Sequence, residues 1–333
     1  MTVSIRDIAR QTGLSVGTVS RALKNQDGLT ETTRVRVSKV AHAMGYDFSR
    51  LKQGKIRRVV FLLHRQHEGE SASLFFSPVL QGAETACRQA GVALSLITSG
   101  PTEPLLEQIR LHQADAIICA GYVEPEVLTA LRHTNKPMVL LDARQAGFHS
   151  VCPDHRLGGL LATRHLIQNG RKRIAMISGS LAHFSIAERA RGFRQALFDN
   201  KMLADPALEI NLDDVHDLHA SIARAMDYLI HLPQPPDAVF CYNDSTALEV
   251  VKYCHQRGIK IPSQLAIIGF DDIQAAAQSI PPLSSIRIDK HALGATGIGM
   301  LLHQAPATDS PLLSTNETIQ PVTLIMREST CDD

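Results

Sequence analysis

Residues 4–23 read SIRDIARQTGLSVGTVSRAL and predict two short helices joined by a tight turn. Ser4 and Asp7 fit the capping-box pattern, in which a serine oxygen and an acidic side chain satisfy free backbone N–H groups at a helix start. A helix is therefore expected to begin near Ile5. It is expected to end at Gly13, because glycine accepts the positive φ that follows many helix ends.

A second helix is predicted over residues 16–23, with Ser15 as its cap after a turn of about three residues. Two helices joined in this way form a helix-turn-helix, which is the geometry of many DNA readers. A third helix is expected from about Glu31 to Met44, capped by Thr30 and ending at Gly45. The residues expected on its inward face are Val35, Val37, Val40, Ala41 and Met44.

Basic residues are concentrated at the same end of the chain. Residues 1–58 contain 12 Lys or Arg and 4 Asp or Glu, a net charge of +8, whereas the rest of the 333 residues contain 22 and 29, a net charge of −7. A basic end on a mildly acidic body indicates that one end meets a polyanion such as DNA.

From residue 59 onward, short apolar runs alternate with helical stretches, as in βαβ units. Runs of this kind suit strands buried on both faces, so we expect an α/β fold of doubly wound parallel sheets, with ligands beyond the carboxyl ends of the strands. The predicted strands are residues 59–63, 93–98, 116–120, 138–141, 174–178, 238–242, 265–269 and 322–326. The predicted helices between them include residues 79–90, 157–169, 188–198 and 246–256.

Ordered motifs along the whole chain resemble the LacI (lactose-repressor-like) family of transcription regulators. Near the N-terminus the motifs are IRDIA (5–9), GLSVGTVSRAL (13–23), TRVRV (33–37) and GY (45–46). In the body they are KPMVLLD (136–142), ERARGF (188–193), YND (242–244), IIGFDD (267–272) and PPLSSI (281–286). The resemblance implies a small all-α helix-turn-helix domain and a two-lobed body similar to periplasmic sugar-binding proteins.

By this resemblance, residues 1–46 form a DNA-binding headpiece, residues 47–58 a shortened basic hinge, and residues 59–333 an effector-binding and dimerisation domain. Lobe 1 is expected to span about 59–160 and 289–318, and lobe 2 about 161–288 and 319–333. The hinge lacks the Pro-Asn pair of the family pattern. Leu51 is the leucine placed to enter the minor groove, and the alternative is a disordered basic linker in which Leu51 has no role.

Carried over by motif, Val16, Gly17 and Arg21 face base edges in the major groove. Arg21 has the bidentate fork that fits guanine, whereas Val16 offers only apolar contact. The alternative for Val16 and Gly17 is an ordinary packing role, although a glycine inside a helix costs about 1 kcal/mol and usually marks a close approach. The remaining candidates for DNA contact are Ser4, Ser15, Thr18, Ser20, Lys24, Asn25 and Leu51.

The same resemblance implies an effector site between the lobes, with Arg189 and Asp271 at its centre. A guanidinium and a carboxylate bind adjacent hydroxyls of a sugar, and the alternative is an interlobe ion pair without a ligand. The other candidates are Asp142, Asp154 and Asn243 around the pair, Phe75 or Phe76 on the opposite lobe, and His183 and Phe184 at positions that vary in the family. One of the two adjacent phenylalanines is expected to be ordinary core, and a plain loop is the alternative for His183 and Phe184.

Other kinds of chemistry are not indicated. No apolar run approaches the about 18 residues of a membrane helix, and the N-terminus lacks a basic region followed by an apolar stretch, so we expect a cytoplasmic protein. The six cysteines show no paired spacing and are expected to be reduced. No catalytic motif or strict metal spacing is present, and residues 294–299 (GATGIG) are expected to let a helix pack closely. We therefore predict no enzyme activity, no cofactor and no metal.

These features predict a ligand-responsive DNA-binding regulator, a repressor of sugar or other carbon-source genes. It is expected to bind a near-palindromic operator as a homodimer, and a small-molecule effector, a sugar or a derivative, is expected to release or recruit it. Two rival hypotheses use the same cleft: a sugar-binding protein and a sugar-metabolising enzyme. The basic headpiece argues against the first, and the lack of a nucleophile with a base beside it argues against the second.

Overall fold

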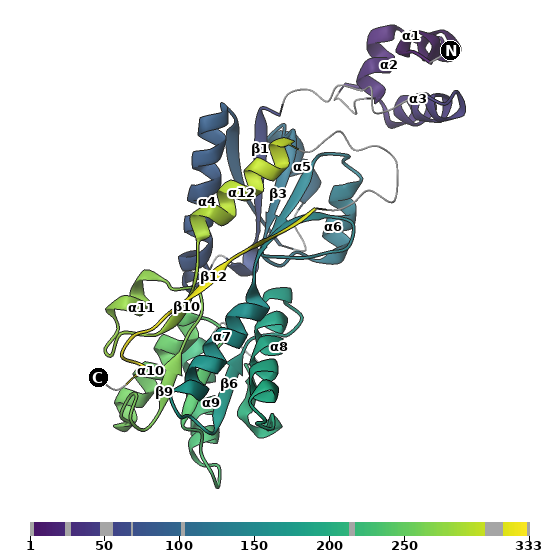
Figure 1. Ribbon diagram of the computed structural model, residues 1–333. Coiled ribbons are helices and arrows are strands. Elements are labelled where there is room, and N and C mark those ends of the chain that lie inside the picture. Colours follow the sequence, from purple (N-terminus) through teal and green to yellow (C-terminus); the bar gives the residue numbers. More distant parts are fainter. Residues whose placement is uncertain are drawn as a thin grey trace.

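The computed structural model describes residues 3–23, 28–46, 56–67, 69–100, 104–212, 217–303 and 316–331. Three helices come first along the chain, α1 (Ile5–Thr12), α2 (Val16–Leu23) and α3 (Glu31–Ala43), and Figure 1 shows them as a small unit of their own. Their buried core contains only residues of this unit: Ile8, Ala9, Val19, Ala22, Val37, Ala41 and Tyr46. The predicted helix-turn-helix is therefore present.

Local hydrogen bonds set the ends of the first two helices as predicted. The Ser4 backbone N–H donates to Asp7 Oδ2 at 2.9 Å and the Asp7 N–H donates to Ser4 Oγ at 3.4 Å, which completes the capping box. Gly13 ends α1 with a φ of 68°. The Thr18 N–H donates to Ser15 Oγ at 3.0 Å at the start of α2.

One prediction for the third helix is confirmed in part and one is wrong. Thr30 is the N-cap residue of α3, but its side chain makes no cap hydrogen bond, and its hydroxyl contacts those of Thr32 and Thr33 instead. Val35 is 44% exposed rather than buried. It lies two residues from the buried Val37, and two residues turn a helix by more than half of its circumference.

Lobe 1 is built on a six-stranded parallel sheet in the order β11-β5-β4-β3-β1-β2. Helices α4 (Glu70–Ala90) and α12 (Lys290–His303) pack on one face, and α5 (Leu105–Leu111) and α6 (Pro125–Arg132) on the other (Figure 1). The strands are β1 (Arg58–His64), β2 (Ala93–Ser99), β3 (Ala116–Ala120), β4 (Met138–Leu141), β5 (His149–Pro153) and β11 (Glu317–Gln320). A short 3-10 turn, Arg65–His67, follows β1.

Lobe 2 contains a four-stranded parallel sheet in the order β7-β6-β8-β9. Helices α7 and α8 pack on one face, and α9 and α10 on the other. The strands are β6 (Ile174–Ser178), β7 (Glu209–Asn211), β8 (Ala238–Cys241) and β9 (Ala266–Ile268), and a 3-10 turn, Pro206–Leu208, precedes β7. The helices are α7 (His155–Gln168), α8 (Phe184–Asp199), α9 (Leu218–Ile230), α10 (Asp244–Arg257) and α11 (Gln274–Gln278).

The chain passes between the lobes three times. Strand β5 of the lobe 1 sheet leads into α7, which packs on α8. Strand β10 (Ser285–Ile288), which is bridged to the end of β9, leads back into α12. Strand β11 then leads into β12 (Val322–Ile325), which pairs antiparallel with β10. The expected boundary at residues 288–289 lies between β10 and α12, whereas those at 160–161 and 318–319 lie within α7 and β11.

All eight predicted strands are present, with ends that match or differ by one residue, and the described residues contain four more strands that were not predicted. The four additional strands are β5, β7, β10 and β11, which are short and lack a long apolar run. Helix α4 also begins at Glu70 rather than near residue 79, and it continues through Pro78. Proline cannot donate the backbone hydrogen bond of this turn, which costs stability. Phe75 and Phe76, just before the proline, are buried, and their burial offsets this cost.

Glycines bring the covering helices into close contact, once in each lobe. A Cβ atom on Gly82 of α4 would lie 2.1 Å from the His291 carbonyl oxygen of α12, and one on Gly294 would lie 2.0 Å from the Val79 oxygen of α4. In lobe 2, a Cβ atom on Gly159 of α7 would lie 2.2 Å from the Arg189 carbonyl oxygen of α8. The prediction that small residues at 294–299 allow close helix packing is confirmed.

Candidate functional site

The first candidate surface is the outer face of α2. Val16 is 47% exposed, and Gly17 and Arg21 are exposed on the same side, whereas Val19 and Ala22 of the opposite side are buried in the headpiece core. Packing within the headpiece does not require a glycine at position 17, because a Cβ there would meet only Ser15 Oγ, at 3.8 Å. The three residues expected to read bases, Val16, Gly17 and Arg21, therefore lie on one exposed face of α2.

The other residues expected to contact DNA are placed less uniformly. Ser4 is exposed, but its hydroxyl donates to Asp7 Oδ2 at 2.6 Å in the capping box. Ser15 and Thr18 share a hydrogen bond of 2.8 Å between their hydroxyls, and Ser20 is half-buried. Lys24, Asn25 and Leu51 lie outside the described residues.

The second candidate site lies where the carboxyl ends of the two sheets face each other. In each sheet, the first strand along the chain has the second strand on one side and the third on the other, so the chain changes direction across the sheet there. This switch point lies between β1 and β3 in lobe 1 and between β6 and β8 in lobe 2. Ligands of open α/β sheets bind at such switch points. The side chains that follow these four strands are His67, Tyr122, His183 and Tyr242.

Arg189 of α8 lies at the centre of this region and is buried. Its Nη2 donates to Asp271 Oδ1 at 3.1 Å, its Nη1 donates to the Tyr242 carbonyl oxygen, and its Nε donates to His155 Nδ1 at 3.3 Å. The guanidinium carbon also lies 3.8 Å from the centre of the Phe270 ring. Arg189 and Asp271 both belong to lobe 2, so their ion pair is not an interlobe bridge.

His155 extends these contacts into lobe 1. Its Nε2 lies 2.7 Å from Oδ1 of Asp142, which directly follows β4, and both side chains are buried. The imidazole therefore joins a carboxylate at the end of the lobe 1 sheet to the guanidinium of lobe 2. We call Asp142, His155, Arg189 and Asp271 the interlobe chain.

Both carboxylates of the interlobe chain sit on unusual backbone. Asp142 has a φ of 55° and Asp271 a φ of 100°, in the region that favours glycine. Burial raises the pKa of Asp271, and the neighbouring Arg189 and Lys290 oppose this shift. Backbone strain of this kind concentrates at ligand sites, because the surrounding structure must hold it in place.

A group of rings closes the other side of the region. The His183 ring of lobe 2 stacks on Tyr122 of lobe 1, with centroids 4.8 Å apart, and lies 6.2 Å from His67. His67 Nε2 accepts a hydrogen bond from the Tyr122 N–H at 3.2 Å. Burial, followed by the nearby His183 and His64, lowers the pKa of His67 to about 4, and burial also lowers the pKa of His183. Both imidazoles are therefore neutral near pH 7.

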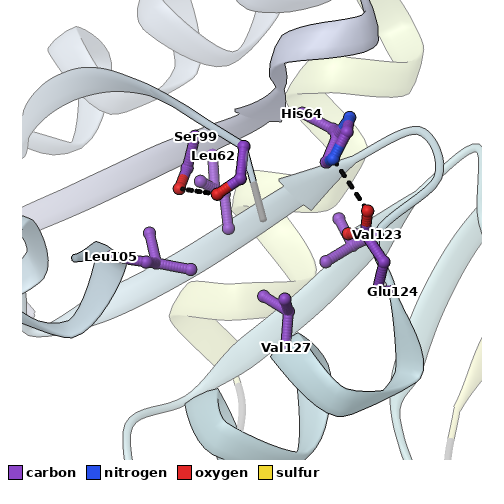
Figure 2. A pocket seen from close by; sticks show the side chains of 8 residues that line it. Leu62, His64, Ser99, Leu105, Val123, Glu124 and Val127 are labelled. Carbon is purple, nitrogen blue, oxygen red and sulfur yellow. Dashed lines mark hydrogen bonds and ion pairs between the residues drawn. The ribbon is translucent and has the colours of Figure 1, made fainter. Parts of the chain in front are cut away.

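A small cavity also lies at the carboxyl end of the lobe 1 sheet, and no residue of the interlobe chain lines it (Figure 2). His64 Nε2 lies 2.9 Å from Glu124 Oε1 at its edge. The cavity volume is about 10 Å³, enough for one water molecule. The residues around it are Leu62, His64, Ser99, Gly100, Leu105, Val123, Glu124 and Val127. It is too small to serve as an effector site.

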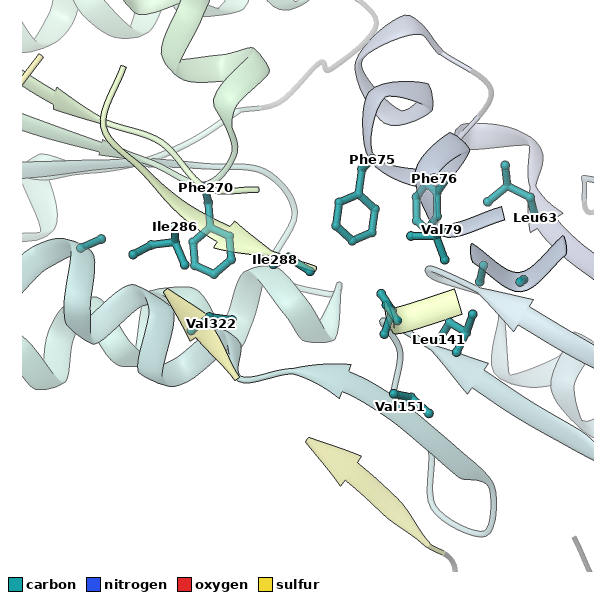
Figure 3. Packing of buried hydrophobic residues seen from close by; sticks show 14 of the residues in the cluster. Leu63, Phe75, Phe76, Val79, Leu141, Val151, Phe270, Ile286, Ile288 and Val322 are labelled. Atoms are coloured by element: carbon teal, nitrogen blue, oxygen red, sulfur yellow. The ribbon is translucent and has the colours of Figure 1, made fainter. Parts of the chain in front are cut away.

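Both predicted phenylalanines of lobe 1 are part of the core. Phe75 and Phe76 are each 7% exposed, and Figure 3 shows them in the cluster that includes Val79 and Leu141. Phe76 also borders the ring group, with its ring 4.9 Å from that of His67. Phe184 is half-buried and lies 6.2 Å, edge to face, from His155.

Two other predicted site residues act as helix caps in this structure. Asp154 Oδ1 accepts the Leu157 N–H at 2.9 Å at the start of α7, and Asn243 Oδ1 accepts the Thr246 N–H at 2.9 Å at the start of α10. Asn243 follows a predicted strand, β8, and Asp154 follows β5, which was not predicted. In each residue the cap bond already uses the side-chain oxygen Oδ1. His67, Tyr122 and His155 were missed. The places of His67 and Tyr122 after the predicted strands β1 and β3 were a signal that could have found them, whereas His155 follows β5, a strand that was not predicted.

Asp244 is a buried carboxyl beneath the interlobe chain. Its Oδ1 lies 2.6 Å from Ser285 Oγ and its Oδ2 accepts the Ile273 N–H at 2.8 Å. A Cβ on Gly269 would lie only 2.1 Å from Oδ1, so the carboxyl is enclosed. Burial, followed by the nearby Asp271, raises the pKa of Asp244 to about 8.

The protonation of Asp244 predicts a pH dependence of stability. Because its pKa is higher in the folded than in the unfolded protein, the folded state binds the proton more tightly. We expect the free energy of unfolding to fall as pH rises from about 4 to about 8, by at most about 1.4 kcal/mol per pH unit from this group. Asp244→Asn mimics the protonated acid and should flatten that slope in urea unfolding between pH 5 and 9. An equal slope in both proteins would show that Asp244 is ionised when folded.

The described residues contain neither a metal site nor a membrane-spanning helix. They contain no group of three or more His, Cys, Asp or Glu arranged to hold a metal ion. None of their helices is long and apolar enough to cross a membrane. Their six cysteines are unpaired, and five of them are buried.

Comparison with known proteins agrees with this geometry. Residues 4–48 match the family model of bacterial regulatory proteins, lacI family, and residues 163–330 match that of a periplasmic binding protein-like domain. The HTH-type transcriptional repressor PurR of Vibrio atlanticus (strain LGP32) is 30% identical over 317 residues, which are 92% of this chain and 93% of that protein. The chain belongs to the lacI family of bacterial regulatory proteins. This lacI-family protein is a DNA-binding transcriptional repressor and not an enzyme.

Solved structures support the fold of this lacI-family chain over its full length. The transcriptional regulator CelR in complex with cellobiose aligns with a TM-score of 0.69 at 24% identity, covering 98% of this chain and 99% of that one. The lac repressor dimer bound to operator and the anti-inducer ONPF aligns with a TM-score of 0.71 at 20% identity, covering 100% of both chains. The predicted two-lobed, periplasmic-binding-protein-like body with parallel sheets is confirmed.

Proposed function

We propose that this lacI-family repressor binds a near-palindromic operator as a homodimer, and that a sugar or sugar derivative held between the lobes controls this binding. In this proposal residues 1–46 are the headpiece, residues 47–58 the hinge and residues 59–333 the effector and dimerisation domain. The lac repressor dimer with operator and anti-inducer, and CelR with cellobiose, support it by analogy.

The observation that carries the proposal is the interlobe chain. Asp142 belongs to lobe 1 and Asp271 to lobe 2, and His155 and Arg189 connect them. The contacts are 2.7 Å from Asp142 to His155, 3.3 Å from His155 to Arg189 and 3.1 Å from Arg189 to Asp271. A ligand that bonds to either carboxylate changes the contact between the lobes. An effector controls DNA binding only if it binds two arrangements of the lobes with different affinity, and contacts made from both lobes provide that difference.

The proposed effector residues divide by chemistry. Arg189, Asp271 and Asp142 would bind hydroxyls, and His183, Phe184 and Phe76 would lie against the apolar C–H side of the sugar. Asp154 and Asn243 would contribute the oxygens that their cap bonds leave over. Phe75 is assigned to the lobe 1 core.

The decisive experiment is selection of bound sequences from a random DNA pool by the purified protein, with and without a panel of sugars. We expect a near-palindrome with half-sites about one helical turn apart or a multiple of it, and one sugar that changes its enrichment. Failure to recover any motif would refute operator binding by this headpiece. A palindrome that no sugar affects would refute the sugar as effector.

Arg21→Ala tests the proposed base reading. Loss of a bidentate contact to guanine should weaken operator binding by about 1–3 kcal/mol and relax the preference at one base pair of each half-site. Titration of the selected operator and of its single-base variants measures both effects. Weaker binding with unchanged preference would assign Arg21 to a phosphate instead.

Gly17→Ala separates the two interpretations of the helix glycine. Since the Cβ would meet only Ser15 Oγ at 3.8 Å, alanine should stabilise the folded headpiece by about 1 kcal/mol. If Gly17 is required for close approach to DNA, the same variant should bind the operator more weakly or select a different sequence. A more stable protein with unchanged operator selection would leave Gly17 without a role in recognition.

A further inference from the structure

The turn that follows β9 presents two adjacent carboxylates to different parts of the molecule. Asp271 and Asp272 both have a positive φ, of 100° and 48°. The Asp271 side chain contacts Arg189 in the interlobe chain. The Asp272 side chain, which is 7% exposed, contacts two other arginines instead. One short turn therefore connects the candidate effector site to a second set of contacts.

The two arginines come from the strands at the junction of the lobes. Arg287 of β10 donates from Nε to Asp272 Oδ2 at 2.6 Å. Arg327, two residues beyond the end of β12, donates from Nη2 to Asp272 Oδ1 at 2.7 Å. Strands β10 and β12 pair with each other where the chain passes between the lobes (Figure 1). The Asp272 carboxylate therefore holds both strands, one with each oxygen.

Lys290 adds a contact from lobe 1. It is the first residue of α12 and is buried, and its ammonium donates to the carbonyl oxygens of Asp271 and Asp272. A cation at a helix N-terminus is unfavourable by itself, because the helix macrodipole is positive there. The two carbonyl oxygens compensate for this position. They also tie the turn to the helix through which the chain re-enters lobe 1.

The Asp272 carboxylate is ionised near neutral pH. Burial by itself raises the pKa of this group, but the hydrogen bonds from Arg327 and Arg287 lower it below its usual value. Hydrogen bonds between charged groups are stronger than neutral ones, so these two contacts resist separation of β10 from β12. An amide could not replace the carboxylate, because its NH2 group would take the place of one acceptor oxygen and face an arginine.

We propose that Asp272 is the positioning residue that transmits effector binding at Asp271 to the strands between the lobes. A shift of Asp271 moves the adjacent residue, and the Asp272 carboxylate carries the shift to β10 and β12. This inference rests on the proposed function, because it names the route by which the effector site changes the arrangement of the lobes. The two neighbouring aspartates then have different effects: Asp271 sets the concentration at which the effector acts, and Asp272 sets the size of the response.

Hydrogen exchange of the full chain tests these contacts without an effector. In Asp272→Asn, the amides of β10 and β12 should exchange about 10- to 100-fold faster, whereas those of β6 and β8 should stay within about threefold of the unmodified protein. Unchanged exchange in β10 and β12 would overturn the inference. An equal increase in all four strands would overturn it as well, because it would show a general loss of stability.

Asp227→Asn is the matched control. It makes the same change in lobe 2, at a carboxylate that accepts from Arg257 Nη2 at 2.9 Å and from the Tyr253 hydroxyl at 2.5 Å, both on α10. This carboxylate lies on α9, outside the strands between the lobes. Exchange in β10 and β12 should therefore match that of the unmodified protein. Acceleration there equal to that in Asp272→Asn would overturn the special position of Asp272.

Arg287→Met is a milder second variant. The Arg287 side chain is 55% exposed, and its loss leaves the contact between Asp272 and Arg327 in place. Exchange of β10 should rise about threefold, as expected for loss of one partly exposed ion pair, and the unfolding midpoint should change little. Unchanged exchange of β10 in this variant overturns the inference, even if Asp272→Asn does not fold.

Operator titration with glucose, galactose, ribose or cellobiose at millimolar concentration separates the inference from the proposed function. For a sugar that alters operator binding, Asp272→Asn should reduce the ratio of operator affinities with and without saturating sugar at least about threefold, while the half-saturating sugar concentration stays within about threefold. An undiminished ratio overturns the inference and leaves the proposed function standing. If none of the four sugars alters operator binding by the unmodified protein, the proposed function fails for these sugars, and hydrogen exchange alone decides whether Asp272 holds the strands.

Discussion

Asp271→Asn is expected to shift the response of operator binding to about 10- to 100-fold higher effector concentration, while operator affinity without effector stays close to that of the unmodified protein. The substitution keeps the size of the side chain but removes the charge that Arg189 Nη2 contacts at 3.1 Å. A hydrogen bond to a charged group contributes about 1.5–3 kcal/mol, so the effector should bind about 10- to 100-fold more weakly. Operator binding in a titration of effector measures the loss.

The headpiece provides the reason why DNA binding should persist in Asp271→Asn. Its core is formed only by residues between Ile8 and Tyr46, with no contribution from either lobe. Asp199→Asn is the matched control, because it makes the same change in lobe 2 at an exposed ion pair of 3.7 Å, which contributes about 0–1 kcal/mol. An Asp271→Asn protein that responds at the same effector concentration as the unmodified protein would remove Asp271 from the site.

Gly294→Ala is expected to destabilise the protein by about 3 kcal/mol, at the upper end of the range for overpacking. The new Cβ would lie 2.0 Å from the Val79 carbonyl oxygen and 2.7 Å from the Ala83 nitrogen. Both are backbone atoms of α4, so no side-chain rotation can relieve the contact. Helices α4 and α12 would have to separate, and the loss should appear as a lower midpoint in guanidinium unfolding.

The control for this prediction lies in the same helix. Gly299 has no heavy atom within 4 Å of its ideal Cβ position. Gly299→Ala should therefore stabilise the protein by about 0.5–1 kcal/mol, through the lower backbone entropy of alanine in the unfolded chain. If the two alanine variants shifted the unfolding midpoint in the same direction, the close crossing of α4 and α12 would be refuted.

Local signals made much of the fold predictable from the sequence. Ser4 with Asp7, Gly13 and Ser15 set the ends of α1 and α2 within a few residues of the chain, so no distant contact is needed to place them. The eight apolar runs form strands of parallel sheets, because a continuous apolar run suits a strand that is buried on both faces. The additional strands could not be predicted in this way, since β7 and β11 are short edge strands with exposed residues.

The candidate site was likewise predictable from the sequence only in part. Asp142 and Asp271 were predicted from the family motifs KPMVLLD and IIGFDD, and both follow predicted strands, beyond whose carboxyl ends ligands of such sheets bind. The structure adds that the two carboxylates belong to different lobes and that His155 connects one of them to Arg189. Phe75 and Phe76 illustrate the reverse case, because both were candidates for the cleft and both are buried in the lobe 1 core.

The sequence by itself therefore determined the helix-turn-helix, the alternation of strands and helices and the family, since all three depend on residues close together in the chain. Only the tertiary structure decided which charges are already paired, which rings face each other across the lobes, and which glycines let helices cross. His155 and Arg189, which are 34 positions apart in the chain, meet because α7 and α8 pack on each other on one face of the lobe 2 sheet. Their contact depends on the packing of whole elements, which no local pattern specifies.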